Sequence, residues 1–253
     1  MKRVLPPIVA LVLFLALWEG GVRALGIKEY LLPPPSAIAK ALVGDSGALG
    51  RAFVTTATAT LLGFGSSVVL GVGTGVVLAS SRLVERAFYP YVILLQTVPI
   101  IAIAPMLNIW FGAGLRASTL CAIIVSVFPI IANTITGIRS VDPALRDLFK
   151  LYGASRLTTL VKLELPSALP NVFTGLRIAA GLSVIGTIVG EFVAGFNDED
   201  AGLGIKILTA NKQLRTDLSF AAVGIASALG LLMFVAVGAL GSRLTRRWHA
   251  SAK

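Results

Sequence analysis

Residues 52–81 read AFVTTATATLLGFGSSVVLGVGTGVVLASS and carry no charged side chain between Arg51 and Arg82. About 20 consecutive apolar residues cross the roughly 30 Å hydrocarbon core of a bilayer, so this stretch predicts a membrane-spanning helix. The whole composition agrees, because 56% of the 253 residues are hydrophobic and 13% are charged, at a mean hydropathy of +0.87. Average soluble domains carry about 25% charged residues, so the sequence excludes a soluble globular protein.

Five more spans follow from the spacing of charges along the chain. The uncharged runs between Arg86 and Arg116, Arg116 and Arg139, and Asp217 and Arg243 have 29, 22 and 25 residues. A further span covers about Asn171–Gly195, where Arg177 and Glu191 lie near the two ends and are expected to reach toward opposite membrane surfaces. The first span, about Val4–Arg23, resembles a secretory signal in its charged start, but no small-x-small cleavage site follows it. The fold prediction is therefore an all-α polytopic membrane protein with six transmembrane helices.

The distribution of basic residues predicts the orientation of these helices. Six spans place both termini on one side, which receives 13 Lys and Arg residues against eight on the other side. Because cytoplasmic loops carry the excess of Lys and Arg, both termini are expected in the cytoplasm. Topology then accounts for the net charge of +10, and no nucleic-acid partner is needed. In the predicted organisation, residues 1–25 form the first transmembrane helix and residues 26–51 form a connector on the outer face. Residues 52–247 form a core of five transmembrane helices that includes a cytoplasmic loop at 139–170, and residues 248–253 form a cytoplasmic tail.

Small residues and prolines distinguish the second, third and fourth spans from ordinary lipid-facing helices. Five glycines in the second span are expected to allow close helix packing: Gly63, Gly65, Gly71, Gly73 and Gly75. Proline interrupts helix hydrogen bonding, and the freed carbonyl groups must face protein or water, which indicates an internal passage. Candidate lining residues of this passage are Gln96, Pro99, Asn108 and Asn133. A buried amide that bonds a neighbouring helix is an equally good interpretation of the three amide side chains.

The 139–170 loop is long enough to have its own fold. Asp142 followed by Pro143 matches a helix N-cap with proline at the first helical position. In the predicted helix, Leu145, Leu148, Phe149 and Tyr152 form one apolar face, and Arg146, Asp147 and Lys150 occupy the other. Gly153 then permits a turn or a close backbone approach. The next stretch, TTLVKLELP, is expected to stop at Pro166. On this pattern alone, the first helix could equally be an interfacial membrane anchor.

The loop resembles the cytoplasmic signature of ABC importer permeases, because Gly153, Leu165 and Pro166 have its spacing. Asp147 stands where the signature has glutamate, Leu148 and Phe149 stand for its two alanines, and Leu163 stands for isoleucine. The stretches YLLPPPSAIAKAL, LLQTVPIIAIAPMLNIWFG, GLRIAAGLSVIGTIVGEFVAG and AGLGIKI are similar to the nitrate, sulfonate, taurine and thiamine-pyrimidine branch of that family. The resemblance implies a bacterial inner-membrane importer that contains two permease copies. We expect two identical copies, a homodimer, and a pair of different permease chains is the alternative.

By the same resemblance, ATP and Mg belong to two copies of a separate ATPase subunit, and an external or lipid-anchored solute-binding protein delivers the solute. The loop then docks into a groove on the ATPase through nine residues: Asp147, Leu148, Phe149, Tyr152, Gly153, Ala154, Leu163, Leu165 and Pro166. The solute would be a small molecule such as a sulfonate, nitrate, taurine or a pyrimidine precursor. The acidic residues Asp198, Glu199 and Asp200 are a candidate contact for the binding protein, or else ordinary solvated loop charge.

The sequence offers no catalytic or metal site of its own. No G-x-x-x-x-G-K-[ST] motif occurs, so the chain is not expected to be an enzyme or to bind a cofactor. Cys121 and His249 are the single cysteine and histidine, which leaves no zinc cluster. The main alternative function is an ion-gradient-driven secondary transporter or channel with Arg177 and Glu191 as intramembrane charges. A membrane enzyme is a weaker alternative, because its acid, base or metal ligands are missing.

Overall fold

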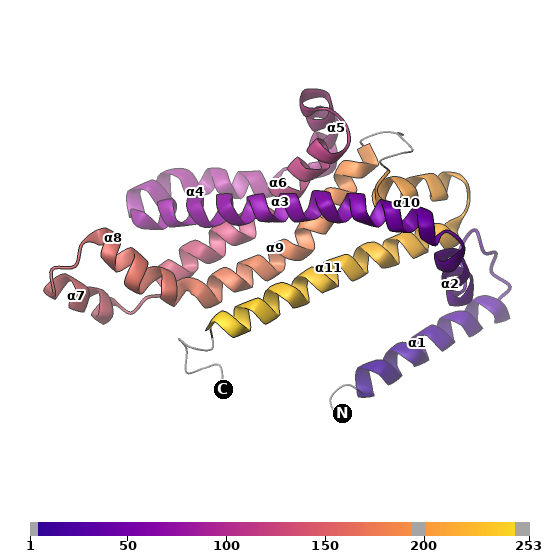
Figure 1. Ribbon diagram of the computed structural model, residues 1–253, viewed down its shortest axis with the longest axis horizontal. Coiled ribbons are helices and arrows are strands. Elements are labelled where there is room, and N and C mark those ends of the chain that lie inside the picture. The colour runs from indigo at the N-terminus through magenta and orange to yellow at the C-terminus, as the bar shows by residue number, and fades with distance from the viewer. Residues whose placement is uncertain (1–4, 194–200, 246–253) are drawn as a thin grey trace. The chain divides into compact units, whose positions relative to one another are not determined.

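The computed structural model describes residues 5–193 and 201–245, and within these ranges it is helical and contains no strand (Figure 1). The helices in chain order are α1 Leu5–Ala24, α2 Pro35–Gly44, α3 Ser46–Ser80, α4 Arg82–Thr97, α5 Ile100–Phe111, α6 Leu115–Arg139, α7 Pro143–Leu151, α8 Arg156–Thr159, the π-helix η1 Leu160–Glu164, α9 Leu165–Val193, α10 Leu203–Lys212 and α11 Thr216–Thr245. Among the described residues, five helices are long and apolar enough to cross a membrane, and the bent pair α4 and α5 makes six if it counts as one span. The all-α prediction with six spans is therefore confirmed in this form.

The chain divides into two compact units. The first unit comprises Met1–Thr56 and Phe196–Ser227, and the second comprises Ala57–Gly195 and Ala228–Lys253. In the first unit, Leu203 at the start of α10 donates its backbone N–H to the Thr56 hydroxyl at 2.8 Å. Arg215, just before α11, donates to the Asp45 carboxylate at 2.6 Å, and this hydrogen bond raises the pKa of the Arg215 guanidinium. The guanidinium therefore keeps its charge throughout the physiological pH range.

The second unit is built around the pair α6 and α9, which form its most extensive helix contact. Small residues allow their backbones to approach closely, since a Cβ atom added at Gly186 would lie 2.7 Å from the Cys121 carbonyl oxygen. At Gly190, an added Cβ atom would lie 2.6 Å from the Cα atom of Ser118. Without a hydrophobic drive between helices in lipid, such close van der Waals packing is a main source of helix association.

The glycines of α3 pack on one face only. Gly63, Gly71 and Gly75 face α6, where an added Cβ atom would meet Ala122, Ile130 and Thr134 within 2.5–2.7 Å. Gly65 and Gly73 have no atom within 4 Å of such a Cβ position. The packing role predicted for the five glycines is therefore confirmed for three of them.

We expect Gly71→Ala to lower the free energy of unfolding by about 1–3 kcal/mol, because the new methyl group overlaps Ile130 and forces α3 and α6 apart. Gly73→Ala, only two residues away, has open space and should be neutral or stabilising through its higher helix propensity. Thermal unfolding of the two detergent-purified variants measures the difference. Equal melting temperatures would show that α3 and α6 are not closely packed at Gly71.

The third predicted span is two helices rather than one. α4 and α5 are bent by 94° at Val98 and Pro99. A residue before proline is restricted to extended conformations, and Val98 has φ −68° and ψ 123°, which ends α4. Pro90 and Pro105 stay inside their helices, so only one of the three prolines breaks the span.

The prediction that the helical stretch TTLVKLELP ends at Pro166 is wrong. The chain stays helical from Arg156 through η1 and along α9 to Val193. Pro166 is the second residue of α9 and follows the π-helical turn directly, and its missing N–H and its ring are tolerated there because the preceding turn is wide. The 139–170 loop and the fifth span are therefore joined by helical backbone.

Candidate coupling loop and translocation path

Helix α7 has well-defined ends. The Asp142 carboxylate accepts a hydrogen bond from the Ala144 backbone N–H at 2.8 Å, which confirms the predicted N-cap, and Pro143 occupies the first helical position. At the other end, the Ala154 N–H donates to the Phe149 carbonyl and the Gly153 N–H to the Lys150 carbonyl, both at 2.9 Å. This is the Schellman arrangement, with Gly153 in the left-handed region at φ +69°. Of the two roles predicted for Gly153, the structure supports the turn, since no atom lies within 4 Å of an added Cβ position.

We expect Asp142→Ala to destabilise α7 by about 1 kcal/mol, because the first-turn N–H groups lose their side-chain acceptor. Asp142→Asn keeps an acceptor oxygen and should behave like the parent protein. Amide hydrogen exchange across Pro143–Leu151 measures the effect, and exchange should be faster in Asp142→Ala only. Unchanged exchange in both variants would mean that the cap does not limit the opening of this helix.

Arg146 holds α7 against the neighbouring helices. Its Nε atom donates to Glu164 of η1 at 2.9 Å, and its Nη2 atom donates to the Ile138 carbonyl at the end of α6 at 2.5 Å. The side chains of Arg146 and Glu164 are only 26% and 20% exposed. The helical pattern predicted that Arg146 lies opposite the apolar face, with Asp147 and Lys150, but it did not predict that Arg146 is half-buried against η1 and α6.

The apolar face of α7 is only partly covered by the described residues. No residue of α7 is buried, and Leu145 and Leu148 are each 44% exposed. Leu151 and Tyr152 at the end of the helix are 85% and 83% exposed. A contiguous apolar surface of this kind marks an interaction site with protein or membrane.

The nine predicted docking residues fall into two groups. Asp147, Leu148, Tyr152 and Gly153 are exposed, and Phe149 and Ala154 are half-buried beside them. The remaining three lie at the root of α9: Leu163 is buried, Leu165 packs against the core of α3, α6 and α9, and Pro166 is half-buried. Leu163 is thus the only one of the nine that is buried, and the four exposed residues all lie on α7 and its C-terminal turn.

The four candidate path residues do not form one cluster. Gln96 and Pro99 are exposed at the break between α4 and α5, and Asn108 lies on α5. Asn133 lies on α6, where its amide donates to the Pro129 carbonyl of the same helix at 2.8 Å. Both polar side-chain atoms of Asn108 are shielded from solvent and have no hydrogen-bond partner in the described part of the chain.

The two intramembrane charges lie differently from the sequence prediction. Arg177 is in the middle of α9, because this helix begins earlier than expected, and its guanidinium lies over the Phe234 ring of α11 at 5.3 Å from the centroid. Glu191 is only 3% exposed, so its side chain does not extend to an outer surface. Gly190 beside it packs against α6.

Some predicted features lie outside the described residues, namely Asp198, Glu199, Asp200 and His249. Cys121 is buried in α6. Within residues 5–193 and 201–245, no group of three His, Cys, Asp or Glu side chains could hold a metal ion.

The sequence matches a family model described as "Binding-protein-dependent transport system inner membrane component" over residues 67–246. The chain belongs to this family. It is thus the permease component of an ABC transporter and a multi-pass inner-membrane protein, and ATP hydrolysis resides on a separate subunit.

Relatives of this permease cover nearly its whole length. It is 36% identical to the riboflavin transport system permease protein RibX of Chloroflexus aurantiacus, over 96% of this chain and 90% of the relative. It is also 36% identical to the formylaminopyrimidine transport permease protein ThiX of Halalkalibacterium halodurans, over 94% of each chain. Among solved structures, a chain of the MetNI methionine ABC transporter in an inward-facing conformation has the same fold at TM-score 0.69 and 18% identity, covering 80% of this permease and 98% of that chain.

Proposed function

We propose that this permease forms the membrane channel of an ATP-driven importer and that α7 is the helix that docks into its ATPase subunit. The observation that carries this proposal is the exposed apolar face of α7 on a helix fixed by two caps and by Arg146. A surface-anchored helix would not need such a firm attachment to α6 and η1. The complete importer would contain two identical permease copies, two ATPase copies and an external solute-binding protein, with both permease termini in the cytoplasm.

The contacts of Arg146 suggest how the movement of the ATPase reaches the membrane. Closure of the two ATPase subunits on ATP would displace α7. Arg146 would pass this displacement to Glu164, at the root of α9, and to Ile138, at the end of α6. Because α6 and α9 are closely packed, the pair would move as one body and alternate the access to the central passage.

For the passage itself, Asn108 is the strongest of the four candidates. Its amide is shielded from solvent and unpaired within the described residues, and an unpaired buried amide costs free energy unless a group beyond these residues satisfies it. Gln96 and Pro99 would line the entrance to the same region, at the bend between α4 and α5. Asn133 is the weakest candidate, because its amide already bonds the Pro129 carbonyl.

The solute we propose is a small nitrogen heterocycle of the pyrimidine or fused-pyrimidine kind. The two relatives at 36% identity are named for riboflavin and formylaminopyrimidine, whereas those named for taurine and sulfonates are 28–30% identical. A sulfonate is the second candidate. The two candidate solutes can be distinguished by measuring the uptake of radiolabelled formylaminopyrimidine and of radiolabelled taurine by cells with and without the permease gene.

Co-purification tests the assembly. The tagged permease, extracted in mild detergent from its native host, should bring an ATPase subunit with it in equal number. Uptake into vesicles should then require internal ATP and resist a protonophore. If the permease purifies alone and a protonophore abolishes uptake, an ion-driven carrier is the correct function and the proposal fails.

A further inference from the structure

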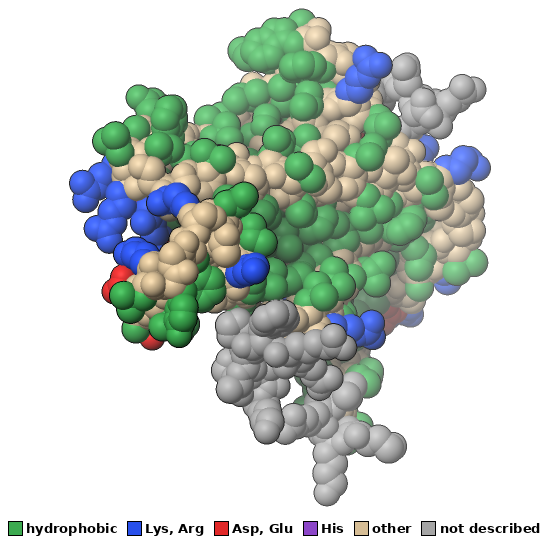
Figure 2. Space-filling model, turned by 60° about the vertical axis from the view of Figure 1, so that its left-hand side comes forward, with side chains coloured by type: hydrophobic (Ala, Val, Ile, Leu, Met, Phe, Trp, Pro, Cys, Tyr) green, Lys and Arg blue, Asp and Glu red, His purple; other side chains and the backbone are tan. Residues whose placement is uncertain are grey.

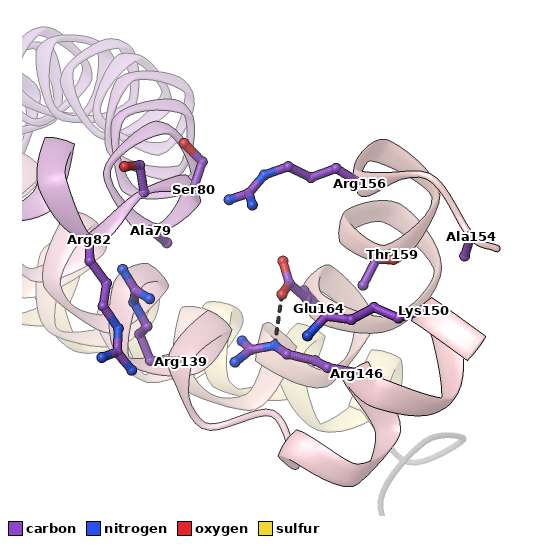
Figure 3. A pocket seen from close by; sticks show the side chains of 11 residues that line it. Ala79, Ser80, Arg82, Arg139, Arg146, Lys150, Ala154, Arg156, Thr159 and Glu164 are labelled. Atoms are coloured by element: carbon purple, nitrogen blue, oxygen red, sulfur yellow. Dashed lines mark hydrogen bonds and ion pairs between the residues drawn. The ribbon is translucent and has the colours of Figure 1, made fainter. Parts of the chain in front are cut away.

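A basic pocket of about 850 Å³ lies beside the 139–170 loop, within the second unit (Figure 3). Its walls come from the junction of α3 and α4, the end of α6, and the segment from α7 to η1. The charged residues that line it are Arg82, Arg139, Arg146, Lys150, Arg156 and Glu164. Five cations against one carboxylate make this the natural place for an anion.

Two of the five cations have no carboxylate partner among the described residues. Arg139 pairs with Glu85, Arg146 with Glu164, and Lys150 with Asp147. Arg82 and Arg156 make no such pair in this part of the chain. Figure 3 shows the Arg156 side chain extending across the opening toward Ser80. Arginine is well suited to phosphate, because its planar guanidinium donates two parallel hydrogen bonds.

The N-terminus of α4 adds to the attraction for an anion. Ser81 and Arg82, the N-cap and first residue of this 16-residue helix, both line the pocket. The Ser81 side chain makes no capping hydrogen bond, so it leaves the first-turn N–H groups of α4 without a side-chain acceptor. Such groups carry a partial positive charge and bind phosphate oxygens in many proteins.

Exposed apolar side chains next to the pocket favour a lipid over a soluble anion. Leu83 and Leu157, which follow Arg82 and Arg156, are 78% and 68% exposed, and Val77 at the end of α3 is 59% exposed. The pocket also lies where the spans α3 and α6 end, which is the level of the lipid headgroups. Figure 2 shows Lys and Arg side chains gathered near this end of the molecule, with hydrophobic side chains around them. A phospholipid would satisfy both features at once.

We propose that the pocket binds the phosphate of an anionic phospholipid between Arg82 and Arg156. The bound headgroup links the start of α4 to the start of α8, and its acyl chains lie along Val77, Leu83 and Leu157. The lipid thereby links the 139–170 loop to the junction of α3 and α4 through these two arginines.

Native mass spectrometry of the detergent-purified permease tests this proposal without any transport measurement. The protein is incubated with phosphatidylglycerol or with phosphatidylcholine of the same acyl chains. The parent protein should retain phosphatidylglycerol preferentially. The variant Arg82→Gln/Arg156→Gln should bind it at least about tenfold more weakly, since each basic residue near an anionic lipid contributes substantially to its attraction.

Two controls separate the pocket from general charge and from folding. Lys162→Gln/Arg243→Gln removes the same charge from exposed residues that do not line the pocket, and it should retain the lipid. Arg82→Lys/Arg156→Lys keeps the charge and should restore most of the binding. All variants are compared at equal helix content by circular dichroism.

Three results would overturn the proposal. Equal lipid retention by the two Gln variants would show that the pocket is not the binding site. Displacement of the lipid by micromolar inorganic phosphate would identify a free anion as the ligand. Loss of the lipid when the ATPase subunit is bound would assign the pocket to an acidic surface of that partner. A failure of the importer assignment alone would leave all these lipid measurements unchanged.

Discussion

The double variant Leu148→Ser/Leu151→Ser is expected to insert normally and to lose its ATPase subunit. Leu148 is 44% exposed and Leu151 85% exposed on α7, so their replacement removes little internal packing of the permease. When an anchoring side chain at an interface is truncated, the binding free energy falls by about 2 kcal/mol or more. We therefore expect the affinity for the ATPase to fall at least about 100-fold and ATP-driven uptake to fall to background.

The matched control for this variant is Leu148→Met/Leu151→Met, which keeps apolar side chains of similar volume and should keep both the ATPase and uptake. The measurement is the ratio of ATPase to permease after affinity purification, with uptake in the same cells. A full complement of ATPase on the Ser variant would mean that α7 is not the docking helix. Reduced membrane levels of the Ser variant alone would indicate that α7 lies on the lipid instead.

Arg146→Ala is expected to separate ATP hydrolysis from transport. The substitution removes the hydrogen bonds to Glu164 and Ile138 but leaves the apolar face of α7 intact. The ATPase should remain bound and hydrolyse ATP, while uptake falls at least about tenfold. The reason is that hydrogen bonds to a charged group contribute about 1.5–3 kcal/mol, and this free energy no longer links α7 to η1 and α6. Arg146→Lys should recover little, since a single ammonium group cannot replace a guanidinium that donates in two directions.

Lys150→Ala is the control for Arg146→Ala, because Lys150 also forms an ion pair on α7 but is 76% exposed. Exposed ion pairs contribute little to the stability of a protein, so uptake by the Lys150→Ala variant should be close to that of the parent. Uptake and ATP hydrolysis are measured together in reconstituted vesicles. If Arg146→Ala lowered both activities in proportion, Arg146 would be a residue for assembly rather than for coupling.

The positions of the spans follow from the sequence because charge is excluded from the bilayer. The ends of α6 and α11 lie near Arg139 and Arg243, where the uncharged runs end. The sequence also accounts for the existence of a break at Pro99, because proline restricts the residue before it. The angle of 94° between α4 and α5 depends on tertiary packing and could not be predicted from the sequence. Local chemistry likewise predicted the Asp142 cap and the turn at Gly153.

The role of Arg146 could not be predicted from a helical pattern. The pattern assigns a charged residue to the polar face, and it contains no information about Glu164, 18 residues further along the chain. Pro166 misled the prediction for a similar reason, because a proline ends a regular helix but is accepted after a π turn. Both differences arise where the structural surroundings of a residue decide what a local sequence rule does not.

The π turn at Leu160–Glu164 holds one residue more than a regular turn would. If that extra residue moved along the backbone, every side chain it passed would rotate by about 100° around the axis, with no break in the chain. Arg156–Val193 is continuous helical backbone. Migration of the extra residue along it would therefore convert a displacement of the loop into a rotation of the polar and apolar helix faces within the membrane.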